Sequence, residues 1–171
     1  METKQPTIVW AEDVPQQDFR PIPWHVNAHG SDIGALCHYS AHWNFTKEPE
    51  PEVEGVKKVR KVGHPPHMHK ENEIIMLIGS NPEDPYDLGA TIEFCFGPNM
   101  EKHVFTRSAT IVIPGGTPHG FFNTIECHRP YMFIEVQEAN SKTEKFLWEY
   151  LSEEELASVD RSKWNDVGFD D

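Results

Sequence analysis

The sequence contains little cysteine and no long apolar run. Its three cysteines, Cys37, Cys95 and Cys127, are odd in number and lack the paired spacing of a disulfide framework or a zinc ribbon, so we expect reduced thiols. No stretch reaches the roughly 18 apolar residues of a membrane-spanning helix. The first ten residues also lack the basic and then apolar order of a secretory signal. These absences predict a soluble, cytoplasmic protein with no membrane partner.

Basic residues are scarce as well. The 15 lysines and arginines face 28 aspartates and glutamates, which gives a formal net charge of −13 at pH 7. A field of this sign repels phosphate backbones, so we expect no nucleic-acid partner. Part of the acidic excess lies in two runs, residues 48–54 and 153–155, which predict solvated surface. The net charge therefore excludes one class of partner and says little about a site.

The first 45 residues predict an extended arm followed by a strand. Four prolines within residues 1–30 exclude a long regular element there. From Ile33 to Phe45, apolar or small residues occupy every second position, which is the period of a strand with one buried face. The opposite face carries His38, Ser40, His42 and Asn44. We expect the apolar face to be buried, and the polar face either to line a cavity or to meet solvent.

The rest of the chain predicts an all-β fold with a short helical end. Short apolar segments bounded by turn residues are typical of a β-sandwich or barrel, and they cover residues 56–62, 73–78, 90–96, 103–106, 110–113, 119–123 and 131–137. Two capping boxes, at 141–144 and 152–155, predict short C-terminal helices. The expected organisation is an N-terminal arm over 1–30, a β-barrel over 31–138, and helices with a tail over 139–171.

Two histidine-containing segments carry the chemistry. His67 and His69 are two residues apart, so on a strand their imidazoles point the same way. Glu73 keeps the same parity at the start of an apolar strand, where a carboxylate is costly unless it coordinates or pairs. Further along the chain, a turn at residues 114–116 is followed by His119. We expect His67, His69, Glu73 and His119 to bind one divalent metal ion.

These segments resemble the two motifs of the cupin superfamily, G-x5-H-x-H-x3,4-E-x6-G and G-x5-P-x-G-x2-H-x3-N. The residues that match are His67, His69 and Glu73 in the first motif, and Pro114, Gly116, His119 and Asn123 in the second. The departures fall on glycine positions of the motifs and involve Lys61, Gly79 and Ser108. The resemblance implies a cupin jelly-roll β-barrel, an octahedral centre of three histidines and one carboxylate with open positions, and a homodimer.

The donor set and the resemblance lead to an expected function. Imidazole with carboxylate suits Mn, Fe, Co, Ni or Zn, and the resemblance favours Mn or Fe. We expect a metal-dependent enzyme that acts on a small oxygen-chelating organic substrate, such as a keto acid, an enol or a phenol. The ion would serve as a Lewis acid or as a site for O2 or water, in an oxygenase, isomerase, lyase or hydrolase. The alternative is a non-catalytic metal- or small-ligand-binding cupin module.

Three further residues are candidates for catalytic acid or base groups. They are Glu93, Glu135 and His42, because each would lie on a strand of the barrel. A solvent-exposed strand face explains the two glutamates slightly better. We interpret His64 and His103 as exposed histidines, with a position behind the metal ligands as the alternative.

Overall fold

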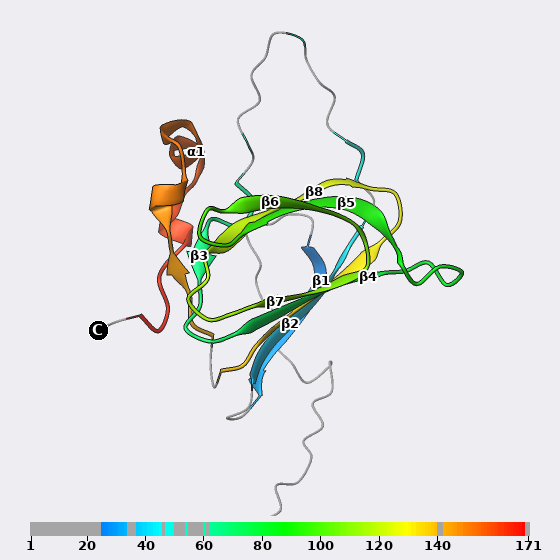
Figure 1. Ribbon diagram of the computed structural model, residues 1–171, viewed down its shortest axis with the longest axis horizontal. Helices are drawn as coiled ribbons and strands as arrows, with labels where there is room; N and C mark the ends of the chain where they lie inside the picture. The colour runs from blue at the N-terminus through cyan, green and yellow to red at the C-terminus, as the bar shows by residue number, and fades with distance from the viewer. Residues whose placement is uncertain are drawn as a thin grey trace, which may run out of the picture.

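The computed structural model describes residues 25–33, 37–45, 47–49, 54, 60, 62–139 and 142–169. In this part of the chain, two antiparallel five-stranded sheets face each other (Figure 1). The first sheet has the order β1 (His25–Ile33), β2 (Cys37–Asn44), β9 (Tyr131–Gln137), β4 (Glu73–Gly79) and β7 (Ala109–Ile113). The second has the order β10 (Lys145–Phe146), β3 (His67–Met68), β8 (His119–Cys127), β5 (Asp87–Phe96) and β6 (Glu101–Arg107). The predicted all-β jelly-roll architecture is confirmed.

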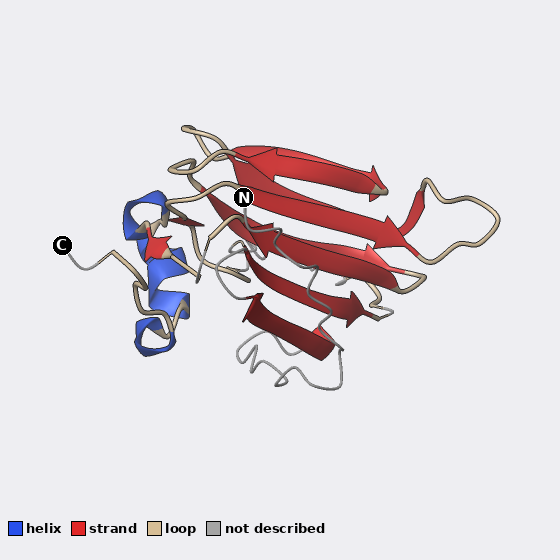
Figure 2. Cartoon of the chain, turned by 90° about the horizontal axis from the view of Figure 1, so that it is seen from below, coloured by secondary structure: helices blue, strands red, loops and turns tan. Residues whose placement is uncertain are grey.

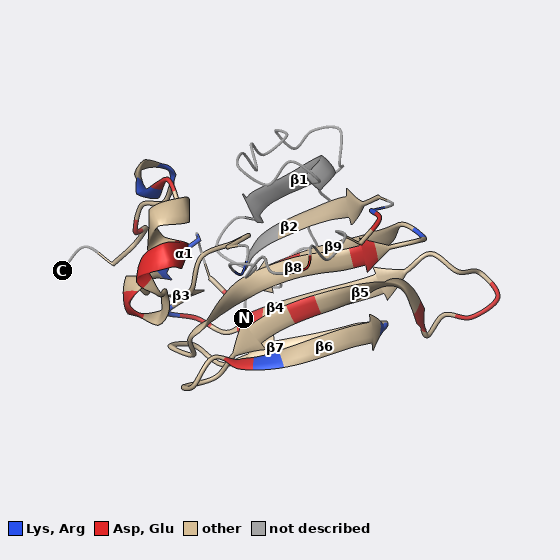
Figure 3. Cartoon of the chain, turned by 90° about the horizontal axis from the view of Figure 1, so that it is seen from above, with Lys and Arg blue, Asp and Glu red and all other residues tan. Residues whose placement is uncertain are grey.

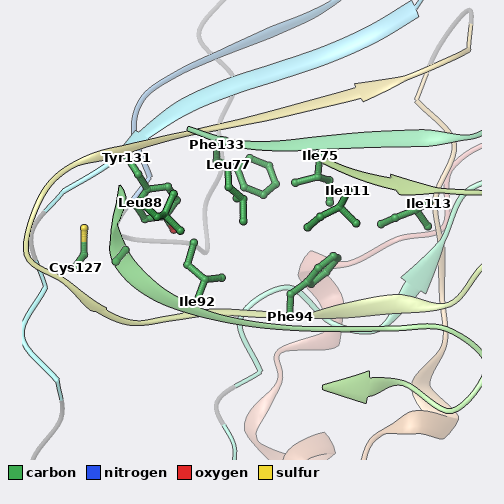
Figure 4. Packing of buried hydrophobic residues seen from close by; sticks show 11 residues of the cluster. Ile75, Leu77, Leu88, Ile92, Phe94, Ile111, Ile113, Cys127, Tyr131 and Phe133 are labelled. Carbon is green, nitrogen blue, oxygen red and sulfur yellow. The ribbon is translucent and has the colours of Figure 1, made fainter. Parts of the chain in front are cut away.

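The core lies between the two sheets, as Figure 4 shows. Strand alternation places Ile75 and Leu77 of β4 inside, opposite Ile92 and Phe94 of β5. Each such side chain contributes roughly 1.5–3 kcal/mol when it leaves water. Toward one end, the core is closed by Tyr131, whose hydroxyl pairs with the hydroxyl of Thr124 at 2.7 Å. The apolar cluster therefore fixes the separation of the sheets on which the site depends.

Strand β2 turns its polar face into the barrel. Ser40, His42 and Asn44 are buried, whereas Phe45, which ends the apolar face, is 46% exposed. The register agrees, because His42 pairs with Phe133 of β9, a member of the core. The alternation of the sequence correctly predicted a strand, and its polar face takes one of the two expected positions, inside the barrel. The apolar face is buried only in part, since Ala41 is 6% exposed but Phe45 is 46% exposed. The polar face of β2 lines the inside of the barrel.

Both ends of the predicted barrel extend further than expected. Strand β1 begins at His25, so residues 25–30, expected in the arm, belong to the first sheet. Residues 1–24 lie outside the described part of the chain, as does most of the predicted strand at 56–62. At the other end, Lys145 and Phe146 form β10, which pairs with β3.

The C-terminal segment contains one of the two predicted helices. The capping box at 152–155 is confirmed. The side chain of Ser152 accepts from the backbone N–H of Glu155 at the start of α1 (Glu153–Ser158), and the side chain of Glu155 accepts from the backbone N–H of Ser152. The box at 141–144 does not begin a helix, because Glu144 forms a β-bridge with Val167 and the chain continues into β10. Two 3-10 turns, η2 (Trp148–Tyr150) and η3 (Arg161–Lys163), complete the segment at one end of the sheets (Figure 2).

Charged residues occur on strands of both sheets as well as outside the sheets. Figure 3 shows acidic residues along the loop between β4 and β5 and on α1. Glu153 and Glu154 are exposed, as predicted, but Glu155 is buried and binds Arg60 through a 2.7 Å ion pair. Within the described ranges, no helix has the length and apolar character needed to cross a membrane.

Candidate metal centre

The four predicted ligands are brought together at one end of the barrel. His67 of β3 pairs directly with His119 of β8, while Glu73 is the first residue of β4. His69 lies between these strands on the short connection that leaves β3. All four side chains are buried, and the most exposed of them, His67, is only 7% exposed. The centre therefore joins both sheets, with His67 and His119 on one and Glu73 on the other.

A turn between β7 and β8 locks the two ligand segments against each other. The backbone N–H of Gly116 donates to the carbonyl of His69 at 2.8 Å. The backbone N–H of Gly115 donates to the side-chain oxygen of Asn72 at 3.1 Å. A Cβ atom at Gly115 would lie 2.3 Å from the carbonyl oxygen of Lys70, so only glycine permits this approach. The turn thus sets the distance between His69 and His119.

Each of the three imidazoles is oriented by a backbone carbonyl. The Nδ1 atoms of His67 and His119 lie 2.7 and 2.9 Å from the carbonyl oxygens of Pro65 and Thr117. The Nδ1 of His69 contacts the carbonyl of Thr143. Since a carbonyl only accepts, the proton of each neutral ring is assigned to Nδ1, which leaves a lone pair on Nε2. Metal-binding histidines in proteins are typically held in this way.

The Nε2 atoms of His69 and His119 face the carboxylate of Glu73, and the side-chain nitrogen of Gln137 also lies 3.3 Å from the Nε2 of His69. Glu73 Oε1 lies 3.3 Å from His69 Nε2, and Oε2 lies 3.0 Å from His119 Nε2. The latter two atoms are buried, yet their geometry is not that of a hydrogen bond. Neighbouring ligands of an ion with bonds of about 2.1 Å stand about 3 Å apart, which matches these separations. The ligand atoms of His67, His69 and His119 also lie within 4.8 Å of one another. The donors present fit a divalent metal ion.

The electrostatics of the site favour a charged Glu73 carboxylate and a neutral His67 ring. Burial opposes ionisation of Glu73, but the neighbouring His119 and His69 outweigh it and hold the pKa of Glu73 below its usual range. Burial and the adjacent His119 and His64 lower the pKa of His67 well below its ordinary value. For His69 burial acts in the same direction, but the neighbouring Glu73 carboxylate outweighs it and raises the pKa of His69 overall. One negative charge with nitrogen lone pairs is a good environment for a divalent ion.

Glu135 is the predicted catalytic residue that lies beside the ligands. Its carboxylate and the ligand atoms of His69 and Glu73 all lie within 4.8 Å of one another. Gln137, which is fully buried, donates to Glu135 Oε1 at 3.3 Å. Burial and the nearby charge of Glu73 raise the pKa of Glu135 to about 7. Glu135 therefore has the position and the proton affinity of an acid or base group.

The other two predicted catalytic residues are not brought to the ligands. Glu93 lies between the buried Ile92 and Phe94, so it faces away from the core, and its carboxylate pairs with Lys102 at 2.7 Å. His42 is inside the barrel, but its ring stacks on Phe133 at 4.7 Å, toward the apolar core. Alternation alone could not separate these positions, because it does not say which face of a strand is inside.

The C-terminal segment supplies site residues that the sequence analysis missed. Besides Thr143, which orients His69, Glu144 places Oε1 3.4 Å from His64 Nε2 and 3.8 Å from His67 Nε2. Lys142 places Nζ 3.3 Å from the same oxygen of Glu144. Gln137 was missed as well. Glu144 matched a capping box in the sequence, and no short-range pattern connects it with histidines so far away in the chain.

His64 differs from the exposed position expected for it. Its side chain is 21% exposed and contacts the ligand His67, with the two Nδ1 atoms 3.0 Å apart. Its ring also packs on Trp164, with ring centroids 4.8 Å apart. Burial lowers the pKa of His64 to about 4 despite the nearby Glu144. His64 thus lies behind the metal ligands. His103 stacks on Phe96 at 4.0 Å on β6, an edge strand.

A bulge in β8 determines which phenylalanine faces the core. The register with β5 shifts between Glu93 and Cys95, and Phe121 on β8 has a φ of 53°. Phe122 consequently packs on Phe94 and Phe133, at centroid distances of 5.6 and 5.0 Å. Phe121 lies instead under the guanidinium of Arg60. Bulges re-aim side chains in this way next to functional sites.

Comparison with known proteins finds similar solved structures at low sequence identity. No family model and no curated protein matches the sequence. Similar solved structures include the polyketide cyclase RemF from Streptomyces resistomycificus, which is 15% identical, with a TM-score of 0.49 over 93% of this chain and 97% of that chain. An RmlC-like cupin from Shewanella frigidimarina is 8% identical, with a TM-score of 0.45 over 81% of this chain and 94% of that chain.

A third similar structure is an oxalate oxidase in complex with the substrate analogue glycolate. It is 14% identical, with a TM-score of 0.40 over 65% of this chain, and the chain spans 46% of the length of that oxidase. The two antiparallel sheets and their strand order give the chain described here a jelly-roll fold.

Proposed function

We propose that this protein is a metal-dependent cupin enzyme whose substrate is a small organic molecule that chelates the ion through neighbouring oxygens. The observation that carries the proposal is the orientation of His67, His69 and His119. Their Nδ1 atoms are on backbone carbonyls, and the buried Nε2 of His119 and Oε2 of Glu73 have no hydrogen bond although they lie 3.0 Å apart. A purely structural cluster would pair these buried atoms with one another.

The protein residues have distinct proposed roles around the ion, for which Mn or Fe is our first choice. A divalent ion supplies Lewis acidity and, if it is redox-active, a site for O2 chemistry. His67, His69, His119 and Glu73 hold it and leave up to two octahedral positions for a keto acid, enol or phenol. Phe94 and Phe122 form an apolar wall between the site and the core that excludes water.

Glu135 is the residue that favours an enzyme over a binding module. Its half-buried carboxyl group lies beside Glu73 and His69, so a proton taken from a bound substrate can be held on it. Gln137 fixes the orientation of that group through its hydrogen bond to Oε1. A module that only stores metal has no need of a carboxyl group with this environment.

Metal content is the first test of the proposal. Protein purified without a metal-affinity tag should contain one equivalent of a divalent metal by plasma mass spectrometry. His119→Ala should lose it, because one of the ligands is removed. His128→Ala is the matched control, since His128 is exposed and distant in register from the site. Wild-type protein that takes up no metal, even on reconstitution, would contradict the proposed site.

A matched pair of carboxylates then separates the enzyme from the binding module. Once a substrate has been found with keto-acid, enol and phenol libraries, Glu135→Gln should keep full metal content and reduce turnover by about 100-fold or more, as expected when a positioned acid or base is removed. Glu93→Gln should leave both unchanged, because that side chain pairs with Lys102 on the outer face. Full turnover in Glu135→Gln would exclude its acid or base role. Metal binding without turnover of any library member favours the module.

A further inference from the structure

A lysine lies next to the acidic residues of the metal centre. Lys142 Nζ is 3.3 Å from Glu144 Oε1, and the Lys142 side chain is 33% exposed whereas that of Glu144 is 8% exposed. Glu144 in turn contacts His64 and the ligand His67. Lys142 is therefore the member of this group that solvent, or a substrate, can reach most easily.

The backbone that carries Lys142 is firmly held at the site. The hydroxyl of the next residue, Thr143, donates to Glu71 at 2.7 Å and accepts from the backbone N–H of Lys70 at 3.0 Å. Glu144 exchanges two backbone hydrogen bonds with Val167, of 2.9 and 2.7 Å. A side chain on an anchored segment loses less conformational entropy when it binds a ligand than one on a free loop.

Lys142 carries more binding capacity than its ion pair uses. An ammonium group has three donors, and Glu144 takes one of them. Burial lowers the pKa of Lys142, but the nearby carboxylates of Glu144 and Glu135 outweigh it and keep the group protonated. Glu144 also has His64 and His67 close by. Neutralising Glu144 therefore does not account for the whole environment of Lys142.

We propose that Lys142 is a specificity residue that binds the carboxylate of a substrate while a neighbouring oxygen of that substrate reaches the metal. The inference rests on the proposed function and narrows its substrate class to α-keto acids and related carboxylates, rather than neutral enols or phenols. A charge-assisted hydrogen bond with a carboxylate outside bulk water is among the stronger polar contacts in proteins. The ion and Lys142 would hold the two ends of the same chelating group.

Binding of two probes to the zinc-loaded protein tests this role without relying on turnover. Pyruvate carries a carboxylate beside a keto oxygen, whereas catechol chelates without a carboxylate. By calorimetry, Lys142→Met should weaken pyruvate binding about tenfold or more, the value of one hydrogen bond to a charged group. Catechol binding should change by less than about twofold, and Lys142→Arg should retain pyruvate. Lys145→Met is the matched control, because Lys145 is nearby in the chain but exposed.

Zinc content, measured before and after each titration, keeps the possible failures apart. Wild-type protein without zinc overturns the proposed function and this inference with it. Full zinc in all variants with unchanged pyruvate binding in Lys142→Met overturns the role of Lys142 and leaves the metal site intact. An equal loss of pyruvate and catechol binding in Lys142→Met also overturns it, because a general disturbance of the site would not distinguish the two probes.

Discussion

The two ends of the barrel interior differ in what they contribute. At one end, Leu77, Leu88 and Tyr131 are fully buried and apolar, apart from one satisfied hydroxyl. At the other end, Glu73 and His119 are equally buried but polar, with atoms that have no hydrogen bond. Strand β4 contributes to both, since Leu77 and Glu73 are four residues apart on its inner face. One sheet therefore contributes both to the stable apolar core and to a polar site whose burial costs free energy.

Because the two ends differ in this way, we expect mutations at the apolar end to change stability and mutations at the polar end to change metal binding. Burial of Leu77 is favourable on its own, whereas burial of Glu73 costs free energy until a partner compensates for it. The apolar end should thus carry the stability of the metal-free protein. The polar end should contribute through the ion, by an amount that depends on the metal concentration.

The largest expected effect tests this separation directly. Leu77→Ala should lower the free energy of unfolding of the metal-free protein by about 2–5 kcal/mol, because it leaves a cavity in a fully buried part of the core. Chemical denaturation measures the loss. Zinc at 100 times its Kd should then stabilise the variant by about 2.7 kcal/mol, the same increment as for the wild type.

His119→Ala provides the other half of this prediction. The variant should gain nothing from zinc under the same conditions, since a ligand is missing. If Leu77→Ala also lost the zinc increment, the two ends would be coupled and the separation would be wrong.

How far the sequence alone predicted this molecule depends on the range of the contacts involved. The grouping of His67, His69, Glu73 and His119 could be predicted, because each pair or turn is encoded by a short spacing. Glu144 and Lys142 could not, because the contact between His69 and Thr143 joins residues 74 apart in the chain. No local pattern carries such information.

The assignment of faces shows a second physical limit. A period of two predicts a strand but does not say which side is buried. The position of the polar face of β2 therefore stayed undecided, and Glu93 was given a catalytic role. The bulge at Phe121 adds to this limit, because one extra residue reverses the alternation after it. Local propensities at 152–155, in contrast, predicted the cap of α1 correctly.

We expect an intermediate effect on zinc affinity from a substitution at the polar end, where the backbones of β3 and β8 lie close together. Gly120 follows His119 with a φ of +147°, and a Cβ there would lie 2.8 Å from Pro66 Cα, next to His67. Gly120→Ala should push β3 away from β8 and weaken zinc binding by about tenfold or more, with all four ligands present. Zinc titration against a competing chelator measures the change.

Gly97→Ala is the control for backbone strain. Gly97 also has a positive φ, of +90°, but a Cβ there meets no atom within 4 Å. This variant should lose about 1 kcal/mol of stability and keep its zinc affinity. Equal zinc affinities in the two variants would show that the spacing of β3 and β8 does not control the site.

The smallest expected effect concerns the cap of α1, which belongs to neither end. Burial raises the pKa of Glu155, but its hydrogen bonds with Arg60 and Ser152 outweigh burial and lower the pKa below the ordinary value of 4.5. A carboxyl group with a lowered pKa in the folded state stabilises the fold above its unfolded pKa and loses that contribution as the pH falls through the folded value. Glu155→Gln should therefore cost about 1 kcal/mol at pH 7 and progressively less below pH 4.5, measured by urea denaturation across that range. The zinc affinity of Glu155→Gln should equal that of the wild type at pH 7, because the pair of Arg60 and Glu155 holds the helix and not the ligands. A loss of zinc affinity in this variant would instead show that α1 supports the metal ligands.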